Sequence, residues 1–167
     1  PIEFELTPRS RAVMDALYKA LGTQFVEPNI TASNATPVAP SKPVIGEYWP
    51  GQGGIYAGMC RGRDGESDYH LILSMEAPKT DFTWQAALDH AKTITADGQK
   101  DYTVPTRWES ALLYANLQDQ FETDCWHWTS TQSSENNAFF QYFLGGGQGS
   151  HGKDYARRCR FVRRSVL

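Results

Sequence analysis

Two cysteines and two histidines late in the chain have the side chains best suited to chemistry: Cys125, His127, His151 and Cys159. Thiolate and imidazole are ligands that zinc prefers, and a thiolate is also a nucleophile. These residues come from three separate segments without C-x2-C spacing, and no activating group is near either cysteine in sequence. We therefore expect no metal site, no cofactor and no catalytic residue. Cys159 alternates with Phe161 and is expected to face the core.

Two charged stretches resemble sites but have simpler explanations. The segment RDGES contains Asp64 and Glu66 but lacks the spaced acidic residues of a calcium-binding loop, and a tight turn accounts for it. RRCRFVRR, residues 157–164, contains five arginines and could suggest nucleic-acid binding. Acidic residues outnumber basic ones by 19 to 16 over the whole chain. We therefore favour ion-paired or solvated arginines and expect no nucleic-acid partner.

The elements that position these residues follow from turn signals and hydrophobic periodicity. Alternating segments bounded by glycine-rich or polar turns predict strands at 45–49, 55–60, 69–74, 125–131, 138–144 and 155–164. Two helices are predicted between the third and fourth strands. Strands, then helices, then strands indicate an α+β domain rather than alternating βαβ units.

The two predicted helices have different start signals. Thr83 is the expected N-cap of the first, which runs to about Ile94. Thr106 and Glu109 form the capping box that opens the second. The apolar stripes are Trp84, Ala87, Leu88 and Ala91 in the first helix, and Trp108, Ala111, Leu112 and Ala115 in the second.

The first 43 residues differ in composition from the rest. Thr7, Pro8 and Gly22 mark the start and stop of a short amphipathic helix. Residues 27–43 contain four prolines among Ser, Thr, Asn and Ala, which predicts an extended linker. We expect residues 1–43 to tether a domain of residues 44–167, with the helix as the contact of any homo-oligomer.

Composition narrows the function classes only slightly. No apolar run approaches the roughly 20 residues that span a bilayer, so no membrane insertion is expected. The opening PIEFELTPRSR lacks a signal-peptide pattern, so nothing in the sequence predicts export. Three cysteines, an odd number, fit folding in a reducing compartment, although one disulfide stays open. The high aromatic content, 13%, suits either a core or a contact surface.

Several motifs occur in an order typical of one family: GGIYAG near residue 53, a helix opening at Trp84, VPTRWE, WHWTST, AFFQYFLGGGQ and RCRFVRR. This order resembles the C-terminal domain of the Legionella collagen-like adhesin and its bacterial and bacteriophage relatives, over about residues 45–167. Phe143 corresponds to the strand phenylalanine of that family. The chain departs from the usual pattern at Val104, where leucine is usual, and at Cys159, where a valine-like residue is usual.

The resemblance implies a C-type-lectin-like α+β fold with mixed antiparallel sheets and two helices. It also implies a ligand-binding module, often an adhesin or a phage receptor-binding part, on a phage particle or a bacterial surface. Some relatives are variable proteins diversified by retroelements at surface positions of the C-terminal hairpin. Mannose-type C-type lectins bind calcium and sugar through a Glu-Pro-Asn triplet. Here Glu27-Pro28-Asn29 lies in the predicted linker, so we expect calcium-independent binding.

Two alternatives stay open. Formylglycine-generating enzymes, which modify sulfatases, are distant users of this fold, and this interpretation makes Cys125 and Cys159 a reactive pair. The other alternative is a structural subunit of a phage tail or surface assembly, in which the aromatic residues contact a neighbouring protomer.

The C-terminal hairpin is the expected contact surface. The period of two puts Trp126 and Trp128 on one face of their strand, expected to be core. If Phe143 is buried, Phe140 and Tyr142 point away from the core. Exposed rings beside adaptable polar groups are typical of a binding surface for a cell-surface protein or glycan. The expected ligand-binding residues are His127, Gln132, Ser134, Glu135, Asn136, Phe140, Tyr142, Gln148, Ser150, His151, Asp154 and Tyr155.

Overall fold

The computed structural model describes residues 43–166 and, in the N-terminal part, Ala16, Lys19 and Ala20, which are helical. The rest of the predicted N-terminal helix, and the predicted linker up to residue 42, lie outside the described residues. The strands are β1 (Tyr48–Trp49), β2 (Gly54–Cys60), β3 (Tyr69–Ser74), β4 (Trp126–Gln132), β5 (Asn137–Tyr142), β6 (Gln148–Gly152) and β7 (Val162–Val166). The helices are α2 (Trp84–Ala91), α3 (Arg107–Leu117) and the short 3-10 helix η1 (Gln118–Gln120).

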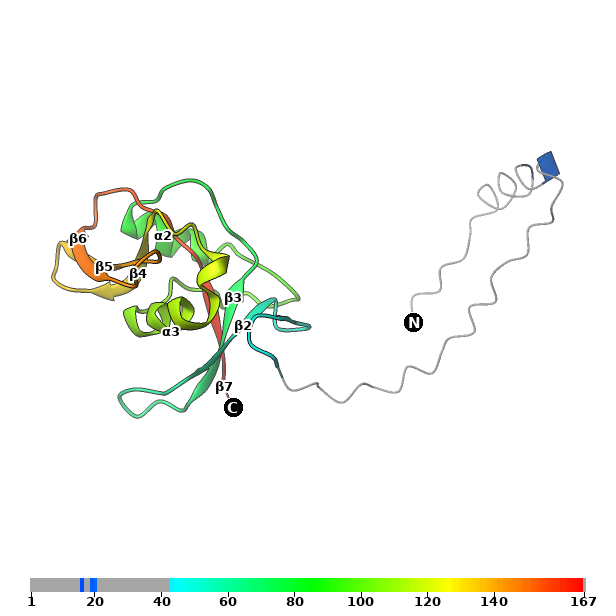
Figure 1. Cartoon of the computed structure of the whole chain (residues 1–167), viewed down its shortest axis with the longest axis horizontal. Helices are drawn as coiled ribbons and strands as arrows, with labels where there is room; N and C mark the ends of the chain where they lie inside the picture. The colour runs from blue at the N-terminus through cyan, green and yellow to red at the C-terminus, as the bar shows by residue number, and fades with distance from the viewer. Residues whose placement is uncertain (1–15, 17–18, 21–42, 167) are drawn as a thin grey trace. The chain divides into compact units, whose positions relative to one another are not determined.

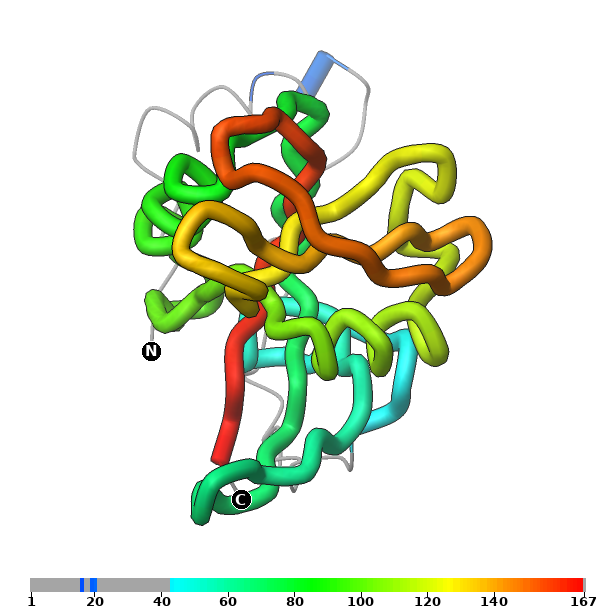
Figure 2. Tube along the Cα trace, turned by 90° about the vertical axis from the view of Figure 1, so that its left-hand side faces the viewer, coloured from blue at the N-terminus to red at the C-terminus, as the bar shows by residue number. Residues whose placement is uncertain are grey.

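The described strands form two antiparallel sheets, which confirms the predicted α+β class. One sheet has four strands in the order β1-β2-β3-β7, and the other has three in the order β4-β5-β6. Strand β7, near the C-terminus, pairs with β3 rather than with its neighbours in sequence. Figures 1 and 2 show α3 between the two sheets, and it contacts β2 on one side and β4 and β5 on the other.

Helices α2 and α3 differ in the hydrogen bonds that cap their N-termini. In α3 the Thr106 side chain accepts from the amide of Glu109, and the Glu109 carboxylate accepts from the amide of Thr106, which confirms the predicted capping box. Thr83 is the N-cap residue of α2 but makes no side-chain capping hydrogen bond. This helix ends at Ala91, before the predicted end at Ile94.

The predicted apolar stripe of α3 is not its core face. Leu113 and Leu117 are buried against the four-stranded sheet and Phe143, and Glu109 is also buried. Trp108 is 47% exposed. Because α3 packs between two sheets, the residues that face either sheet are buried, whereas Trp108 lines a cavity at the surface.

The C-terminal third differs most from the prediction. QGSHG, expected to be a glycine-rich loop, forms β6. Of the predicted strand 155–164, residues 155–161 form an irregular segment, and residues 162–164 are the first part of β7. Strand β6 pairs with β5 through backbone groups, and its residues QGSHG do not alternate between apolar and polar side chains. Hydrophobic periodicity therefore does not predict this strand. Cys159 and Phe161 are buried, as predicted, in the cluster formed with α2 and Trp128.

Candidate binding face on the three-stranded sheet

The register of β4 and β5 puts several aromatic rings on one side of the three-stranded sheet. Trp126 is paired with Tyr142 and Trp128 with Phe140, and directly paired residues project to the same side. Trp128 is fully buried against α2, but Trp126 is 43% exposed. The prediction that both tryptophans belong to the core is therefore wrong for Trp126, which opens β4 and is absent from the core cluster around α2.

Trp126 and Phe140 form a stacked pair beneath an arginine. Their ring centroids are 4.7 Å apart and the rings are 2° from parallel. The guanidinium carbon of Arg157 lies 4.6 Å from the Trp126 centroid and 4.8 Å from that of Phe140, which is cation–π distance. Gly149 on β6 is opposite Phe140, and a Cβ there would lie 2.7 Å from the ring. Glycine therefore allows the Phe140 ring to cover β6.

The prediction that Phe140 points away from the core is wrong, because Phe140 lies on the same side of the sheet as Trp128 and packs against the core cluster around α2. Phe140 and Tyr142 are half-buried, and the more exposed rings are Trp126 and, at 56%, Tyr155. Tyr155 packs edge-on against His151, with centroids 4.2 Å apart. His151 is paired with Ala138, so it lies on the same side of the sheet as Phe140. We call this set the aromatic face: Trp126, Phe140, Tyr142, His151, Tyr155 and Arg157.

The loop between β4 and β5 borders the aromatic face and is held by a lysine. Lys153 Nζ donates to Gln132 Oε1 and to the backbone oxygen of Glu135, each at 2.6 Å. Its amide donates to the backbone oxygen of Asn136. Ser134, Glu135 and Asn136 are exposed, as is Asp154, which follows Lys153. The loop thus presents several predicted ligand-binding residues on a backbone that Lys153 fixes in place.

A cavity of about 250 Å³ adjoins the exposed tryptophan. Asp81, Asp124, Trp126 and Arg158 are among the residues that line it. Arg158 pairs with Asp81 at 2.8 Å and with Glu122 at 2.6 Å, which confirms the predicted ion pairing for this arginine. Carboxylate oxygens beside an exposed indole can accept hydrogen bonds from hydroxyl or amide groups of a ligand.

Three predicted ligand-binding residues lie neither on the aromatic face nor among the exposed polar residues that border it. Gln148 and Ser150 project to the opposite side of the sheet, because they alternate with Gly149 and His151. Gln148 is also held there by hydrogen bonds to the backbone oxygen of Arg107 and to Gln141 Oε1.

His127 is the third, and it is a core residue at 5% exposure. Its ring packs edge-on against Phe121 and Phe143, with centroids 5.3 and 5.1 Å away. Burial lowers its pKa to about 4. A side chain enclosed in this way cannot reach a surface ligand.

Two members of the aromatic face were missed by sequence reasoning. The sequence pattern places Trp126 in the core and groups Arg157 with the ion-paired or solvated arginines. Burial lowers the pKa of Arg157, and its Nε has no hydrogen-bond partner among the described residues. Arg157 precedes Arg158 in the arginine run, so composition alone does not separate the stacked arginine from the ion-paired one.

The cysteines are placed poorly for thiol chemistry. All three are free, and burial raises the pKa of Cys159. Burial and the hydrogen bond to Asp124 raise the pKa of Cys125, which disfavours the reactive thiolate. Within residues 43–166 and the three described N-terminal residues, no three His, Cys, Asp or Glu side chains are grouped as metal ligands.

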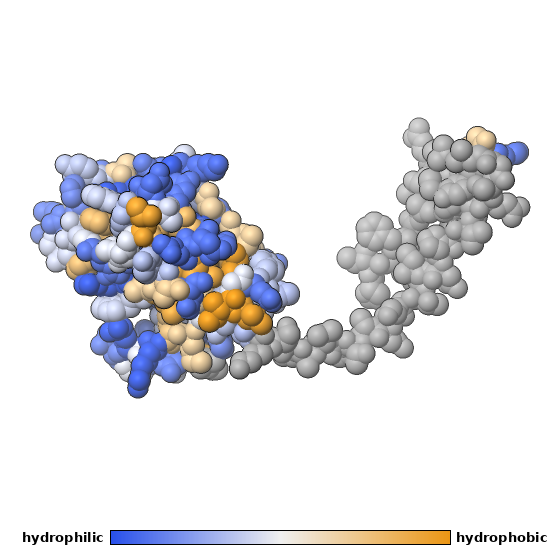
Figure 3. All heavy atoms as spheres, in the orientation of Figure 1, coloured by the Kyte–Doolittle hydropathy of each residue, from blue (hydrophilic) through white to orange (hydrophobic). Residues whose placement is uncertain are grey.

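Most of the surface visible in Figure 3 is hydrophilic, and strongly hydrophobic residues occupy only small parts of it. Among the described residues, no helix combines the length and the apolar character needed to cross a bilayer.

No protein-family model matches the chain, and no curated protein matches it.

Proposed function

We propose that residues 44–167 form a non-catalytic recognition module with a C-type-lectin-like fold, of the kind found in adhesins and phage receptor-binding proteins. The observation that carries the proposal is the stack of Trp126, Phe140 and Arg157. These groups are ordered by mutual packing before any ligand arrives, yet the indole remains 43% exposed. Large, rigid, partly exposed rings contribute contact area at low entropic cost.

The ligand class that fits is a protein or glycan on a cell surface. Exposed polar residues at 132–136 lie along one edge of the aromatic face. At another edge, Asp81 and Asp124 line the cavity beside Trp126. Aromatic anchors inside a polar rim are typical of protein interfaces. No metal or cofactor enters the proposed contact. Because the loop side chains are exposed, they can vary without disturbing the core, as in relatives diversified by retroelements.

Alanine substitution at the two exposed rings tests the proposal. The full chain is immobilised and presented with a panel of intact bacterial and host cells, and retention is compared with that of Trp126→Ala/Tyr155→Ala. We expect the wild type to retain at least one cell type and the double variant to lose about 90% of it, since aromatic anchors dominate binding. Met75→Ala, which removes a side chain exposed to 58%, is the control and is expected to bind normally. Equal retention by the double variant would remove the aromatic face from the site.

A further inference from the structure

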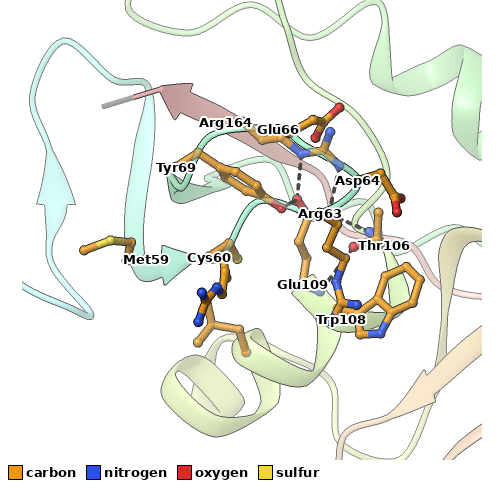
Figure 4. Close-up of a pocket in the computed structure, with 12 residues that line it drawn as sticks. Met59, Cys60, Arg63, Asp64, Glu66, Tyr69, Thr106, Trp108, Glu109 and Arg164 are labelled. Carbon is orange, nitrogen blue, oxygen red and sulfur yellow. Dashed lines mark hydrogen bonds and ion pairs between the residues drawn. The ribbon is translucent and has the colours of Figure 1, made fainter.

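A second cavity, of about 440 Å³, opens between the β2–β3 loop and the start of α3. Its size is within the range of small-molecule sites. It shares no lining residue with the cavity beside Trp126. Its lining includes Arg63 of the loop, Tyr69 of β3, Trp108, Glu109 and Leu112 of α3, and Arg164 of β7 (Figure 4).

The inner wall of this cavity is a fixed ionic network. Glu109 is 1% exposed, and its carboxylate accepts from the Tyr69 hydroxyl and from Arg164 Nε, each at 2.7 Å (Figure 4). The amide of Thr106 also donates to it, at 2.7 Å. The hydrogen bond to Glu109 raises the pKa of Arg164. Glu109 is therefore fully engaged, and its charge is balanced by Arg164.

Arg63 is held in place by an aromatic ring rather than by an acid. Its guanidinium carbon lies 4.2 Å from the centroid of the Trp108 ring, and Figure 4 shows the two side chains together. Among the described residues, the Arg63 side chain has no ion pair and no hydrogen bond. A guanidinium that rests on a ring keeps its N–H donors, which lie in its own plane, available for an acceptor. Arg63 is thus a positioned donor whose guanidinium has no protein acceptor within the part of the chain that the structure describes.

Apolar side chains line the cavity near this guanidinium. Trp108 is 47% exposed, and Leu112, which also lines the cavity, is half-buried. A ligand that covers these side chains gains hydrophobic contact. Arg61, Asp64 and Glu66 also line the cavity and are exposed, so water screens all three. The two carboxylates outweigh the single Arg61 guanidinium, so these three residues together disfavour a second negative charge on the ligand.

We propose that this cavity binds a small aromatic carboxylate, with the carboxylate on the Arg63 guanidinium and the ring against Trp108 and Leu112. A carboxylate matches the forked donors of arginine and brings a single charge. A phosphate ester matches the same donors but brings nearly two charges towards Asp64 and Glu66. The inference does not rest on the proposed function, because the aromatic face contributes no residue to this cavity.

Phenylacetate is the probe, with the neutral phenylacetamide and the dianionic phenyl phosphate as matched compounds. The full chain is labelled with 15N, and the indole N–H of Trp108 is followed by NMR after assignment by Trp108→Phe. We expect a saturable shift with a dissociation constant on the order of 1 mM, as suits a ligand of this size. The amide and the phosphate ester are expected to bind about tenfold more weakly.

Arg63→Met separates the guanidinium from the cavity shape. Arg63 is exposed in a loop, so the variant is expected to fold, and its remaining amide signals confirm this. Its affinity for phenylacetate is expected to fall about tenfold. Lys100→Met removes an exposed charge that does not line the cavity and is expected to bind as the wild type does. The proposal is overturned by unchanged affinity of Arg63→Met, by an amide or phosphate ester that binds as tightly as phenylacetate, or by no saturable shift in the wild type.

Discussion

His127 shows how one residue changes role once its surroundings are known. Its ring is enclosed by Phe121 and Phe143, and its Nδ1 has no hydrogen-bond partner among the described residues. Burial favours the neutral ring and lowers the pKa to about 4. The residue that composition placed in a binding site is instead a source of pH-dependent stability.

The free energy of unfolding is expected to depend on His127 in mildly acidic solution. Its pKa is about 6.5 in the unfolded chain and about 4 in the fold, so the unfolded state binds a proton more readily. The stabilisation is complete above about pH 6.5 and is lost as the pH falls towards 4, with a total of about 3 kcal/mol. Urea unfolding of wild type and His127→Gln between these pH values measures it. The same slope in both proteins would contradict this assignment.

At the scale of elements, the two helices differ in how their first turns are satisfied. In α3 the capping box joins Thr106 and Glu109 reciprocally, and the same Glu109 binds Tyr69 and Arg164. The start of this helix is therefore tied to β3 and β7. The start of α2 has no side-chain cap, and Trp84 is held instead by burial and by a hydrogen bond from its indole to the backbone oxygen of Thr129.

Alanine at the two N-caps should therefore have unequal effects. Thr106→Ala removes an acceptor for the amide of Glu109 and is expected to cost about 1 kcal/mol of stability. Thr83→Ala removes no capping hydrogen bond and is expected to cost less than about 0.5 kcal/mol. Chemical denaturation of both variants gives the comparison. Equal losses would mean that the capping box does not stabilise α3.

At the scale of the whole domain, helix α3 contacts both sheets. Its buried side packs on β2 and β5, and two hydrophobic clusters lie within the described residues. One cluster is built around α2, Trp128 and Phe161, and the other around β2, β3, α3 and Phe143. The range 42–167 forms one structural unit, so this part of the chain should carry the main cooperative unfolding transition.

Deletion of residues 1–42 is expected to shift the thermal midpoint of that transition by less than about 2 °C. It should also abolish any homo-oligomer, since the predicted helix in that segment is the expected contact. Calorimetry and light scattering of the full and shortened chains measure both effects. An oligomer that persists after the deletion would place the contact on the domain and favour the alternative of an assembly subunit.

Local sequence determined the elements whose signals lie within a few residues. The capping box fixes the start of α3, and turn signals with alternating apolar residues fix β2, β3, β4 and β5 to within a few positions. Burial of Cys159 and Phe161 agrees with their predicted alternation, whereas the expectation that Phe143 is buried comes from the family resemblance. In each case the side chains that stabilise the local structure are close together in the sequence, so the same residues also allow that structure to be predicted.

Tertiary structure alone decided which rings reach the surface and which charges are paired. Trp126 and Trp128 share a strand face, but only Trp128 lies in the cluster around α2. Strand β6 forms because β5 offers backbone partners, and the cavity at Trp108 arises where segments distant in sequence meet. Exposure depends on what packs above a side chain, and that neighbour comes from elsewhere in the chain. Periodicity within one segment therefore cannot specify it.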